Sequence, residues 1–370
     1  MPRQMETLGA NKKPIIADRW IAMSKPFQIA LTADFYHPDG QPKYADFGLS
    51  VFDDQPNIQL RQFAEHRPQI GADQFAGANG VIVLTPSVTR ETVAAADDLL
   101  AIGRFGVGYD AVDVAACTAA DVLVCITTGA VDRPVAEAVI GWMIGLTHHI
   151  RAKDRLVREG TWDERSRYMG CELRDRTLGV IGMGGIARKV LELLAGWGMQ
   201  PPLAFDPYID PAVAAKLGVR LVGLDELLRT SDFVSIHCPL TDSTRGLIGV
   251  RELALMKPDA YLINSARGGI VDEGALYDAL KNGRLAGAAL DCFAKEPVTV
   301  PSRFGDLENV LLAPHSIAWT NEMFRDIGRT ACEGMVELAH KRKPRGVVNP
   351  EVFERVGFQK KWDRICGGPC

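Results

Sequence analysis

Long apolar runs and blocks of like charge are both missing from this sequence. The uncharged stretch AVIGWMIGLTHHI at residues 138–150 is too short, and too polar at its end, to span a membrane. No run of five or six like charges occurs, and a formal net charge of -4 gives no basic field of the kind that binds nucleic acid. We therefore expect a soluble protein whose partner is a small molecule.

The eight cysteines lack CxxC pairs and the spacing of metal ligands. Several lie in apolar runs, where a free cysteine behaves as a small hydrophobic residue. We therefore expect no metal site, and a reducing, cytoplasmic environment. Residues 1–26 have no apolar core of the kind found in a secretory signal, so they are interpreted as an N-terminal arm.

A chain of 370 residues, 47% hydrophobic and 24% charged, is long enough for two compact domains with a cleft between them. From Phe27 onward, short apolar runs alternate with helical patterns, which is typical of parallel strands joined by crossover helices. We expect an α/β protein with two flavodoxin- or Rossmann-like domains, each with a doubly wound parallel sheet.

The first set of elements is expected to have strands at 27–33, 80–85, 101–108 and 122–127, and helices near 57–66, 90–100 and 112–121. One long helix over 134–160 is expected to bridge to a second set. That set is predicted to hold six strands, at 177–181, 203–208, 233–238, 260–266, 285–293 and 309–315. The amphipathic segment 321–343 is expected to pack back on the first domain.

A glycine-rich turn, GMGGIA, lies between an apolar strand and a helical pattern. Gly182 would permit the tight turn and Gly184 the close approach of a pyrophosphate, with Ala187 in place of the third glycine. Asp206, at the end of the next strand, is placed to bind the adenine ribose hydroxyls. Because no arginine follows it to receive a 2'-phosphate, NAD is favoured over NADP. The alternative is a glycine turn with an unrelated surface aspartate.

Seven motifs follow one another in the chain: GVGYDAVDV (106–114), VIGMGGIA (180–187), AFDPY (204–208), HCPLTDSTRGLI (237–248), LINSARGGIVDEGAL (262–276), GAALDCFAKEP (287–297) and APHS (313–316). In this order they resemble the D-isomer-specific 2-hydroxyacid dehydrogenase family, which includes D-3-phosphoglycerate dehydrogenases and glyoxylate-hydroxypyruvate reductases. The resemblance extends from about Phe27 to Pro350.

The resemblance implies three catalytic residues, Arg267, Glu296 and His315, each of which follows a predicted strand of the second set. His315 would take the proton of the substrate hydroxyl as the hydride leaves C2, and Glu296 would hold the imidazole ring. Arg267 offers a planar fork for the substrate carboxylate. Taken singly, the three also fit a surface ion pair, a loop charge and a strand-end cap.

Further binding residues are implied by the same resemblance. The backbone amides of Val107 and Gly108 would meet the substrate carboxylate, although GVGYD also fits a tight turn without a ligand. The cofactor-binding residues would be Gly182, Gly184, Gly185, Ile186, Asp206, Pro239, Thr244, Ala266 and Asp291.

These interpretations divide the chain into four parts. Residues 1–26 are the N-terminal arm, residues 27–128 plus 320–350 the substrate-binding domain, residues 129–319 the NAD-binding Rossmann domain, and residues 351–370 a C-terminal tail whose CGGPC end is expected to be flexible.

The function expected from the resemblance is NAD-dependent, reversible hydride transfer between NADH and a small 2-oxo acid such as glyoxylate or hydroxypyruvate, in a homodimer. The alternatives are formate dehydrogenase, which has Gln where Glu296 stands, and an NADH-sensing corepressor on the same fold. The sequence leaves open which acid reacts, whether Trp319 borders the site or belongs to the core, and whether Arg165 or Arg167 reaches a neighbouring subunit.

Overall fold

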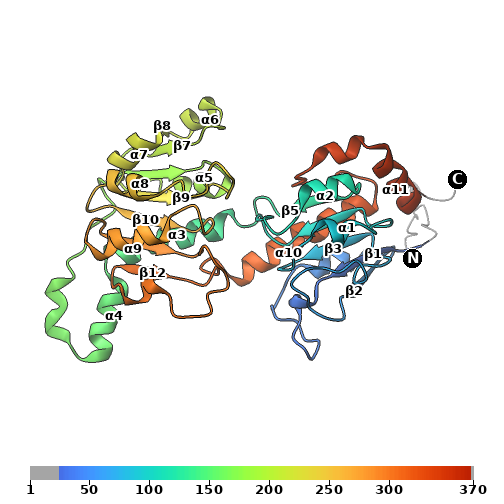
Figure 1. Ribbon diagram of the computed structural model, residues 1–370, viewed down its shortest axis with the longest axis horizontal. Helices are drawn as coiled ribbons and strands as arrows, with labels where there is room; N and C mark the ends of the chain where they lie inside the picture. Colours follow the sequence, from blue (N-terminus) through green and yellow to red (C-terminus); the bar gives the residue numbers. More distant parts are fainter. Residues whose placement is uncertain (1–24, 368–370) are drawn as a thin grey trace, which may run out of the picture.

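The computed structural model describes residues 25–367, and these residues form two lobes, each built on one parallel sheet (Figure 1). The expected α/β fold class is therefore confirmed. The predicted arm at 1–26 lies almost wholly outside the described residues, as do the last three residues of the CGGPC end. No helix among residues 25–367 is long and apolar enough to cross a lipid bilayer.

The first sheet has five strands in the order β2-β1-β3-β4-β5, and all of its pairs are parallel. The central strands are buried, which suits their apolar sequences. The strands are β1 (Phe27–Leu31), β2 (Ile58–Gln62), β3 (Gly80–Val83), β4 (Ala101–Arg104) and β5 (Leu123–Ile126); the intervening helices are η1 (Ala33–Phe35), η2 (Leu49–Phe52), α1 (Arg90–Val93) and α2 (Val114–Ala119).

Two of the helices predicted for the first domain differ from the structure: one is a strand, and the other is shorter than predicted. The segment near 57–66 is not a helix. Its residues Ile58–Gln62 form the extended strand β2, which pairs with β1 at the edge of the sheet. The helix near 90–100 ends at Val93, because the chain then continues in tight turns: the Ala96 amide donates to the Val93 carbonyl and the Leu99 amide to the Ala96 carbonyl.

The second sheet has seven parallel strands in the order β12-β11-β10-β9-β6-β7-β8, one more than the six predicted. The extra strand, β8, has only two residues and pairs at the edge with β7. The strands are β6 (Leu178–Ile181), β7 (Leu203–Phe205), β8 (Arg220–Leu221), β9 (Phe233–Ile236), β10 (Tyr261–Asn264), β11 (Gly287–Leu290) and β12 (Val310–Leu312); the helices are α5 (Gly185–Leu193), α6 (Pro211–Lys216), α7 (Leu224–Thr230), α8 (Val250–Leu255), α9 (Glu273–Lys281) and η4 (Arg303–Asp306).

The bridging segment is two helices rather than one. It forms α3 (Asp132–Thr147) and α4 (Ile150–Glu159), because His149 between them has a left-handed backbone with a φ of 52°. Helix α4 and the short η3 (Trp162–Arg167) project from the lobe of the second sheet (Figure 1).

The last part of the chain returns to the first sheet. Helix α10 (Asn321–Ala339) packs on β3, β4 and β5, as the amphipathic pattern predicted. The predicted tail from 351 is wrong for residues up to 367, because η5 (Pro350–Glu354) and α11 (Val356–Cys366) belong to the same lobe (Figure 1). Phe358 of α11 is fully buried in its core, which holds the helix in place.

Candidate active site

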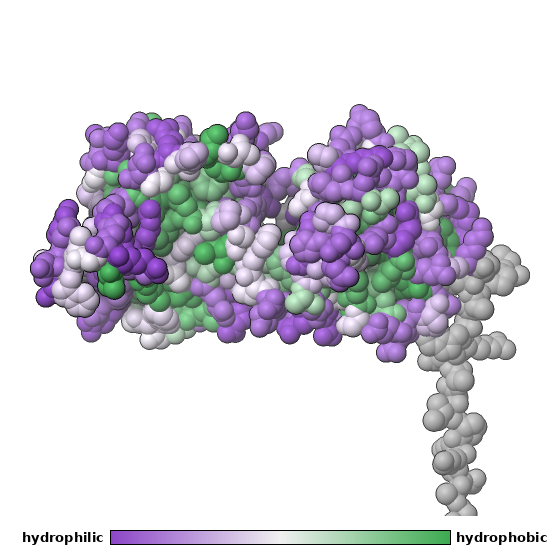
Figure 2. All heavy atoms as spheres, turned by 90° about the horizontal axis from the view of Figure 1, so that it is seen from below, coloured by the Kyte–Doolittle hydropathy of each residue, from purple (hydrophilic) through white to green (hydrophobic). Residues whose placement is uncertain are grey.

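A cavity of about 920 Å³ lies between the two lobes and is lined by residues from both. In the second sheet the lining residues follow the carboxyl ends of β9, β10, β11 and β12, where the strand order reverses between β9 and β7 around β6. In the first sheet they follow β3 and β4. Figure 2 shows the two lobes meeting at a narrow waist. Loops of the first lobe and loops of the second lobe therefore line one cavity.

The glycine-rich turn joins β6 to α5 with the geometry that a dinucleotide needs. Gly182 has a φ of +86°, and a Cβ there would lie 2.7 Å from the Cys238 backbone nitrogen, so only glycine fits. Gly184 is the N-cap of α5, and a Cβ added to it would meet nothing within 4 Å. The open space therefore lies at Gly184, whereas a Cβ added to Gly185 would overlap the Asp132 carboxylate. Backbone amides at such a helix N-terminus can stabilise a phosphate group.

Asp206 lies beside this turn, just after β7. Its carboxylate accepts hydrogen bonds from the backbone amide of Met183 at 2.8 Å and from that of Tyr208 at 2.9 Å. These bonds hold the acid next to the glycine-rich turn, where the ribose hydroxyls of a dinucleotide would lie. The turn and the acid together fit NAD.

His315 and Glu296 form a direct pair at the mouth of the cavity. The His315 Nδ1 atom lies 2.8 Å from Glu296 Oε2, while Glu296 Oε1 accepts a hydrogen bond from the Phe293 amide at 2.8 Å. The side chains are 46% and 34% exposed, so both remain open to solvent and to a ligand. With Nδ1 engaged by the carboxylate, Nε2 is the atom left for proton exchange.

The backbone of His315 is held in an uncommon conformation. Its φ is 53°, in the left-handed region that costs a non-glycine residue about 1 kcal/mol or more. Asp291 supports it: the Asp291 carbonyl accepts from the His315 amide, and its carboxylate accepts from the amides of Ser316 and Ile317. Burial raises the pKa of Asp291, which lies in the cavity wall. Asp291 therefore fixes the turn that aims His315.

Arg267 crosses from the second sheet to the first. Its Nε donates to Asp110 Oδ2 at 2.7 Å, and its Nη1 donates to the Ala266 carbonyl at 2.6 Å. A Cβ added to Gly108 would lie only 1.4 Å from Nη2, so the guanidinium rests directly on the GVGYD turn. The turn thus places Val107, Gly108 and Arg267 around one region of the cavity.

Arg104, at the end of β4, is a lining residue that sequence reasoning missed. Burial, and then the positive charge of Arg267, lower the pKa of its guanidinium to about 10. Its only hydrogen bond among the described residues goes to the Phe105 carbonyl. The sequence contained a signal for this residue: Arg104 is a basic residue two positions before Gly106, in a predicted strand, and the carboxyl ends of such strands face the crevice.

The remaining predicted residues divide into two groups. Ile186, Pro239 and Ala266 line the cavity. Thr244 does not: its hydroxyl donates to the Pro239 carbonyl at 2.7 Å and stabilises an exposed loop instead.

Trp319 lines the same cavity and is 54% exposed, so it borders the site rather than belonging to the core. Its ring packs edge-on against Tyr44 and Phe324, with ring centroids 6.1 and 5.1 Å apart. These rings form an aromatic wall on the side of the first lobe.

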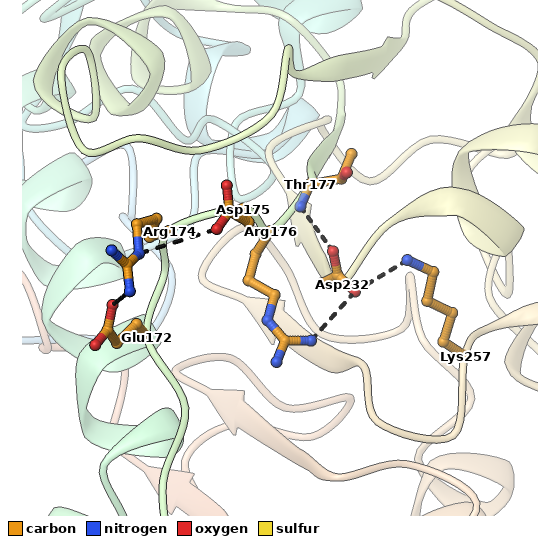
Figure 3. A pocket seen from close by; sticks show the side chains of 7 residues that line it. All are labelled: Glu172, Arg174, Asp175, Arg176, Thr177, Asp232 and Lys257. Carbon is orange, nitrogen blue, oxygen red and sulfur yellow. Dashed lines mark hydrogen bonds and ion pairs between the residues drawn. The ribbon is translucent and has the colours of Figure 1, made fainter.

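A second cavity, of about 500 Å³, lies at the other end of the second sheet (Figure 3). Its charges are paired with one another: Asp232 accepts from the Thr177 amide at 2.7 Å and from Lys257 at 2.9 Å, and Arg176 lies 3.8 Å away. Arg176 and Asp232 lie just before the start of β6 and β9, and the charged groups neutralise one another. The cavity is therefore a structural ion-pair cluster.

Comparison with known proteins relates the chain to one family. Residues 140–316 match the model of the NAD-binding domain of D-isomer-specific 2-hydroxyacid dehydrogenases. The D-3-phosphoglycerate dehydrogenase of Archaeoglobus fulgidus is 39% identical over 272 residues, which are 74% of this chain and 51% of that protein. The human D-3-phosphoglycerate dehydrogenase is 38% identical over 324 residues, 87% of this chain and 58% of that protein. The chain thus spans little more than half the length of these relatives.

Solved structures agree with this relation. A glyoxylate reductase from Paecilomyes thermophila superposes with a TM-score of 0.75 at 28% identity, covering 88% of this chain and 99% of that one. A Pyrococcus horikoshii protein superposes with a TM-score of 0.74 at 26% identity, covering 90% and 98%. Since the matched segment includes the glycine-rich turn, the predicted NAD binding is also confirmed. The chain belongs to the D-isomer-specific 2-hydroxyacid dehydrogenase family.

Proposed function

We propose that the protein is an NAD-dependent D-2-hydroxyacid dehydrogenase that interconverts a small 2-oxo acid and its D-2-hydroxy acid. The observation that carries this proposal is that His315, paired with Glu296, lines the same cavity as Arg267 and as Ile186, which follows the glycine-rich turn. Bound NAD would supply or accept the hydride at C2. The chain itself must then hold the acid and move one proton.

The proton step falls to His315. During oxidation its Nε2 takes the hydroxyl proton, and during reduction it returns a proton to the oxygen at C2. Glu296 holds Nδ1–H, which fixes the tautomer and the ring plane, so it is a positioning residue. Arg267 and the amides of Val107 and Gly108 would bind the substrate carboxylate.

The cavity wall supports a substrate larger than glyoxylate. Arg104 offers guanidinium N–H groups beyond Arg267, and Trp319 with Phe324 forms an apolar side. A 2-oxo acid with a second acceptor group, such as a hydroxyl, carboxylate or phosphate, would satisfy Arg104. A kinetic screen of glyoxylate, hydroxypyruvate, pyruvate and phosphorylated acids, with NADH and NADPH, tests this choice.

The domain division rests on the two sheets. Residues 27–128 and 320–350 would form the substrate-binding domain, extended to residue 367 by η5 and α11, and residues 129–319 the NAD-binding domain. The protein would work as a homodimer joined through α4 and η3. The apolar side chains exposed on that projection support this pairing: Ile150, Val157, Trp162 and Met169.

Replacing His315 with Gln tests the proposed function directly. The change removes the proton-transfer group but keeps a polar side chain of similar size, so turnover should fall by about 10²- to 10⁴-fold. NADH binding, followed by fluorescence titration, should be retained. His66→Gln, at an exposed histidine of the first lobe, is the matched control. Unaltered turnover in His315→Gln would overturn the assignment.

A further inference from the structure

Three side chains with different ligand chemistry meet at the edge of the proposed active site. Cys292, Glu296 and His315 each offer one ligand atom, and these atoms all lie within 4.8 Å of one another. Cys292 lies two residues after the end of β11, Glu296 lies in the next loop, and His315 follows β12. No spacing rule in the sequence links them, because only the sheet brings the two strand ends together.

Cys292 has no role in the proton transfer proposed above. Its side chain is buried, and its Sγ atom makes only a long contact of 3.4 Å with the Ala266 carbonyl. Burial, followed by the charges of Asp291 and Glu296, raises the pKa of this thiol to about 12. The thiol is therefore protonated at neutral pH, and a metal ion would have to displace that proton.

We propose that Cys292, Glu296 and His315 bind a thiophilic divalent cation, with Zn²⁺ as the best fit, and that this cation inhibits the dehydrogenase. One thiolate, one imidazole and one carboxylate are the ligand types that Zn²⁺ takes, and a fourth position is left for water or a substrate oxygen. In a tetrahedral site the ligand atoms lie about 3.5 Å apart, so the longest separation in the cluster, at most 4.8 Å, must shorten by about 1.3 Å or less. His315 Nδ1 and Glu296 Oε2, now 2.8 Å apart, must separate slightly to admit the ion.

The local charges favour a cation. The acidic groups near Cys292 are Asp291, Glu296 and Asp110, against the single guanidinium of Arg267. Solvent reaches the cluster through the exposed parts of His315, which lines the cavity, and of Glu296 beside it. A hard cation such as Mg²⁺ gains little from a thiolate, so the site should discriminate between Zn²⁺ and Mg²⁺.

Inhibition follows from the imidazole, and this part rests on the proposed function. When Zn²⁺ binds His315 Nδ1, the single proton of the neutral imidazole moves from Nδ1 to Nε2 through solvent, and Glu296 turns from the ring to the metal. Nε2 then carries the proton and cannot accept another from a substrate hydroxyl. Binding forms the Zn–S bond and releases the Cys292 thiol proton to solvent.

The test separates metal binding from turnover. The intact protein is titrated with Co²⁺, whose bond to a thiolate gives a charge-transfer absorption in the near ultraviolet, and turnover is assayed with Zn²⁺ or Mg²⁺ present. Cys292→Val removes the thiol at nearly constant size, and Cys292→Ser serves if the valine variant does not fold. Cys117→Val makes the same change at a buried thiol of α2, away from the cluster.

We expect the wild-type protein and Cys117→Val to show the absorption with one Co²⁺ per chain. Turnover of both should be inhibited by Zn²⁺, restored by a chelator and unaffected by Mg²⁺. The Cys292 variants should lack the absorption and need at least tenfold more Zn²⁺ for the same inhibition. Absence of the absorption in the wild type, its persistence in the Cys292 variants, or equal Zn²⁺ inhibition of both would overturn the proposal. Because the absorption needs no turnover, a failure of the proposed function alone would leave it intact.

Discussion

At the residue scale, the lack of a side chain at Gly108 leaves the space that the Arg267 guanidinium occupies. Arg267 Nη2 rests on the Gly108 backbone, and the Asp110 carboxylate and the Ala266 carbonyl hold two other edges of the guanidinium. No positive φ requires glycine here, so the side-chain clash alone excludes a larger residue. The position is therefore a direct probe of the arginine.

Gly108→Ala should disable the site without unfolding the protein. The new Cβ would overlap Nη2, so Arg267 must swing away and lose its alignment; we expect kcat/KM for the 2-oxo acid to fall at least about 10²-fold. Gly141→Ala, in α3, is the matched control, because a Cβ there meets nothing within 4 Å. Steady-state kinetics and thermal unfolding check both variants. Wild-type kinetics in Gly108→Ala would remove Arg267 from the proposed role.

His237 gives the protein a pH dependence that does not require catalysis. Burial lowers its pKa from 6.5 to about 4, and only Nε2 has a partner, the Ser235 hydroxyl at 2.9 Å. Between pH 6.5 and 4 the unfolded chain binds a proton on this histidine and the native protein does not. Native stability should therefore fall as the pH drops through this window.

His237→Gln should remove that contribution. Relative to the variant, the wild-type protein should lose about 2–3 kcal/mol of unfolding free energy between pH 7 and pH 4.5. Urea unfolding at the two pH values measures the difference, and the exposed His66→Gln is the control. Parallel pH profiles for wild type and His237→Gln would contradict this account.

At the element scale, the Lys361 ammonium of helix α11 binds several backbone carbonyls of the first lobe, in addition to the packing of Phe358. Lys361 Nζ lies 3.0–3.1 Å from four carbonyl oxygens, those of Ala96, Leu99, Ala120 and Asp121. These carbonyls lie in the turns after α1 and α2; that of Ala96 also accepts from the Leu99 amide at 3.3 Å. The Lys361 ammonium thus binds backbone carbonyls in the turns after both α1 and α2.

Lys361→Met keeps the aliphatic stem but removes the charged donor. Leaving these carbonyls without it should lower the free energy of unfolding by about 2 kcal/mol. Lys360→Met, at the exposed neighbouring position, should change it by less than about 0.5 kcal/mol. Chemical denaturation compares the two; equal effects would mean that the ammonium contributes nothing specific.

The local sequence pattern predicted the type of element correctly where both faces of a strand are buried. The central strands β3, β4, β9 and β10 read correctly because parallel strands buried on both faces are continuous apolar runs. The edge strand β2 was mistaken for a helix, since an edge strand keeps polar residues on both faces. The break at His149 was missed because a single left-handed residue leaves no periodic signal.

At the scale of the whole molecule, the projection formed by α4 and η3 carries apolar groups far from the cavity. Trp162 is 61% exposed and Met169 80% exposed. Arg165 and Arg167 of η3 pair with Asp163 and Glu164 on the same segment. Figure 2 shows further hydrophobic surface on this lobe. A second copy of the chain is the partner expected to cover it.

Trp162→Glu should therefore weaken self-association. A buried carboxylate without a partner would oppose an apolar interface, so we expect monomers at micromolar concentration where the wild type is dimeric. Trp197→Glu changes a partly exposed tryptophan away from the projection and should remain dimeric. Analytical ultracentrifugation distinguishes the species. A monomeric wild type, or a dimeric Trp162→Glu, would exclude this interface.

The sequence by itself determined the fold class, the cofactor and the chemical types of the proposed site. These depend on short-range features: apolar periodicity sets strands and helices, a glycine-rich turn sets the phosphate site, and Asp206 follows the next strand. Arg267, Glu296 and His315 were selected through the resemblance of the seven motifs to a known family. Their places after predicted strands agree with that choice, because parallel strands end at one edge of a sheet.

Only the tertiary structure decided which of those groups touch. The Arg267–Asp110 pair joins residues 157 positions apart, Arg104 faces a cavity formed by the other lobe, and Cys292 joins His315 through the pairing of β11 with β12. The return of α10 and α11 to the first sheet likewise replaces a predicted tail with a packed helix. Such contacts depend on how the sheets dock and how distant side chains share the available space, and no local pattern encodes that geometry.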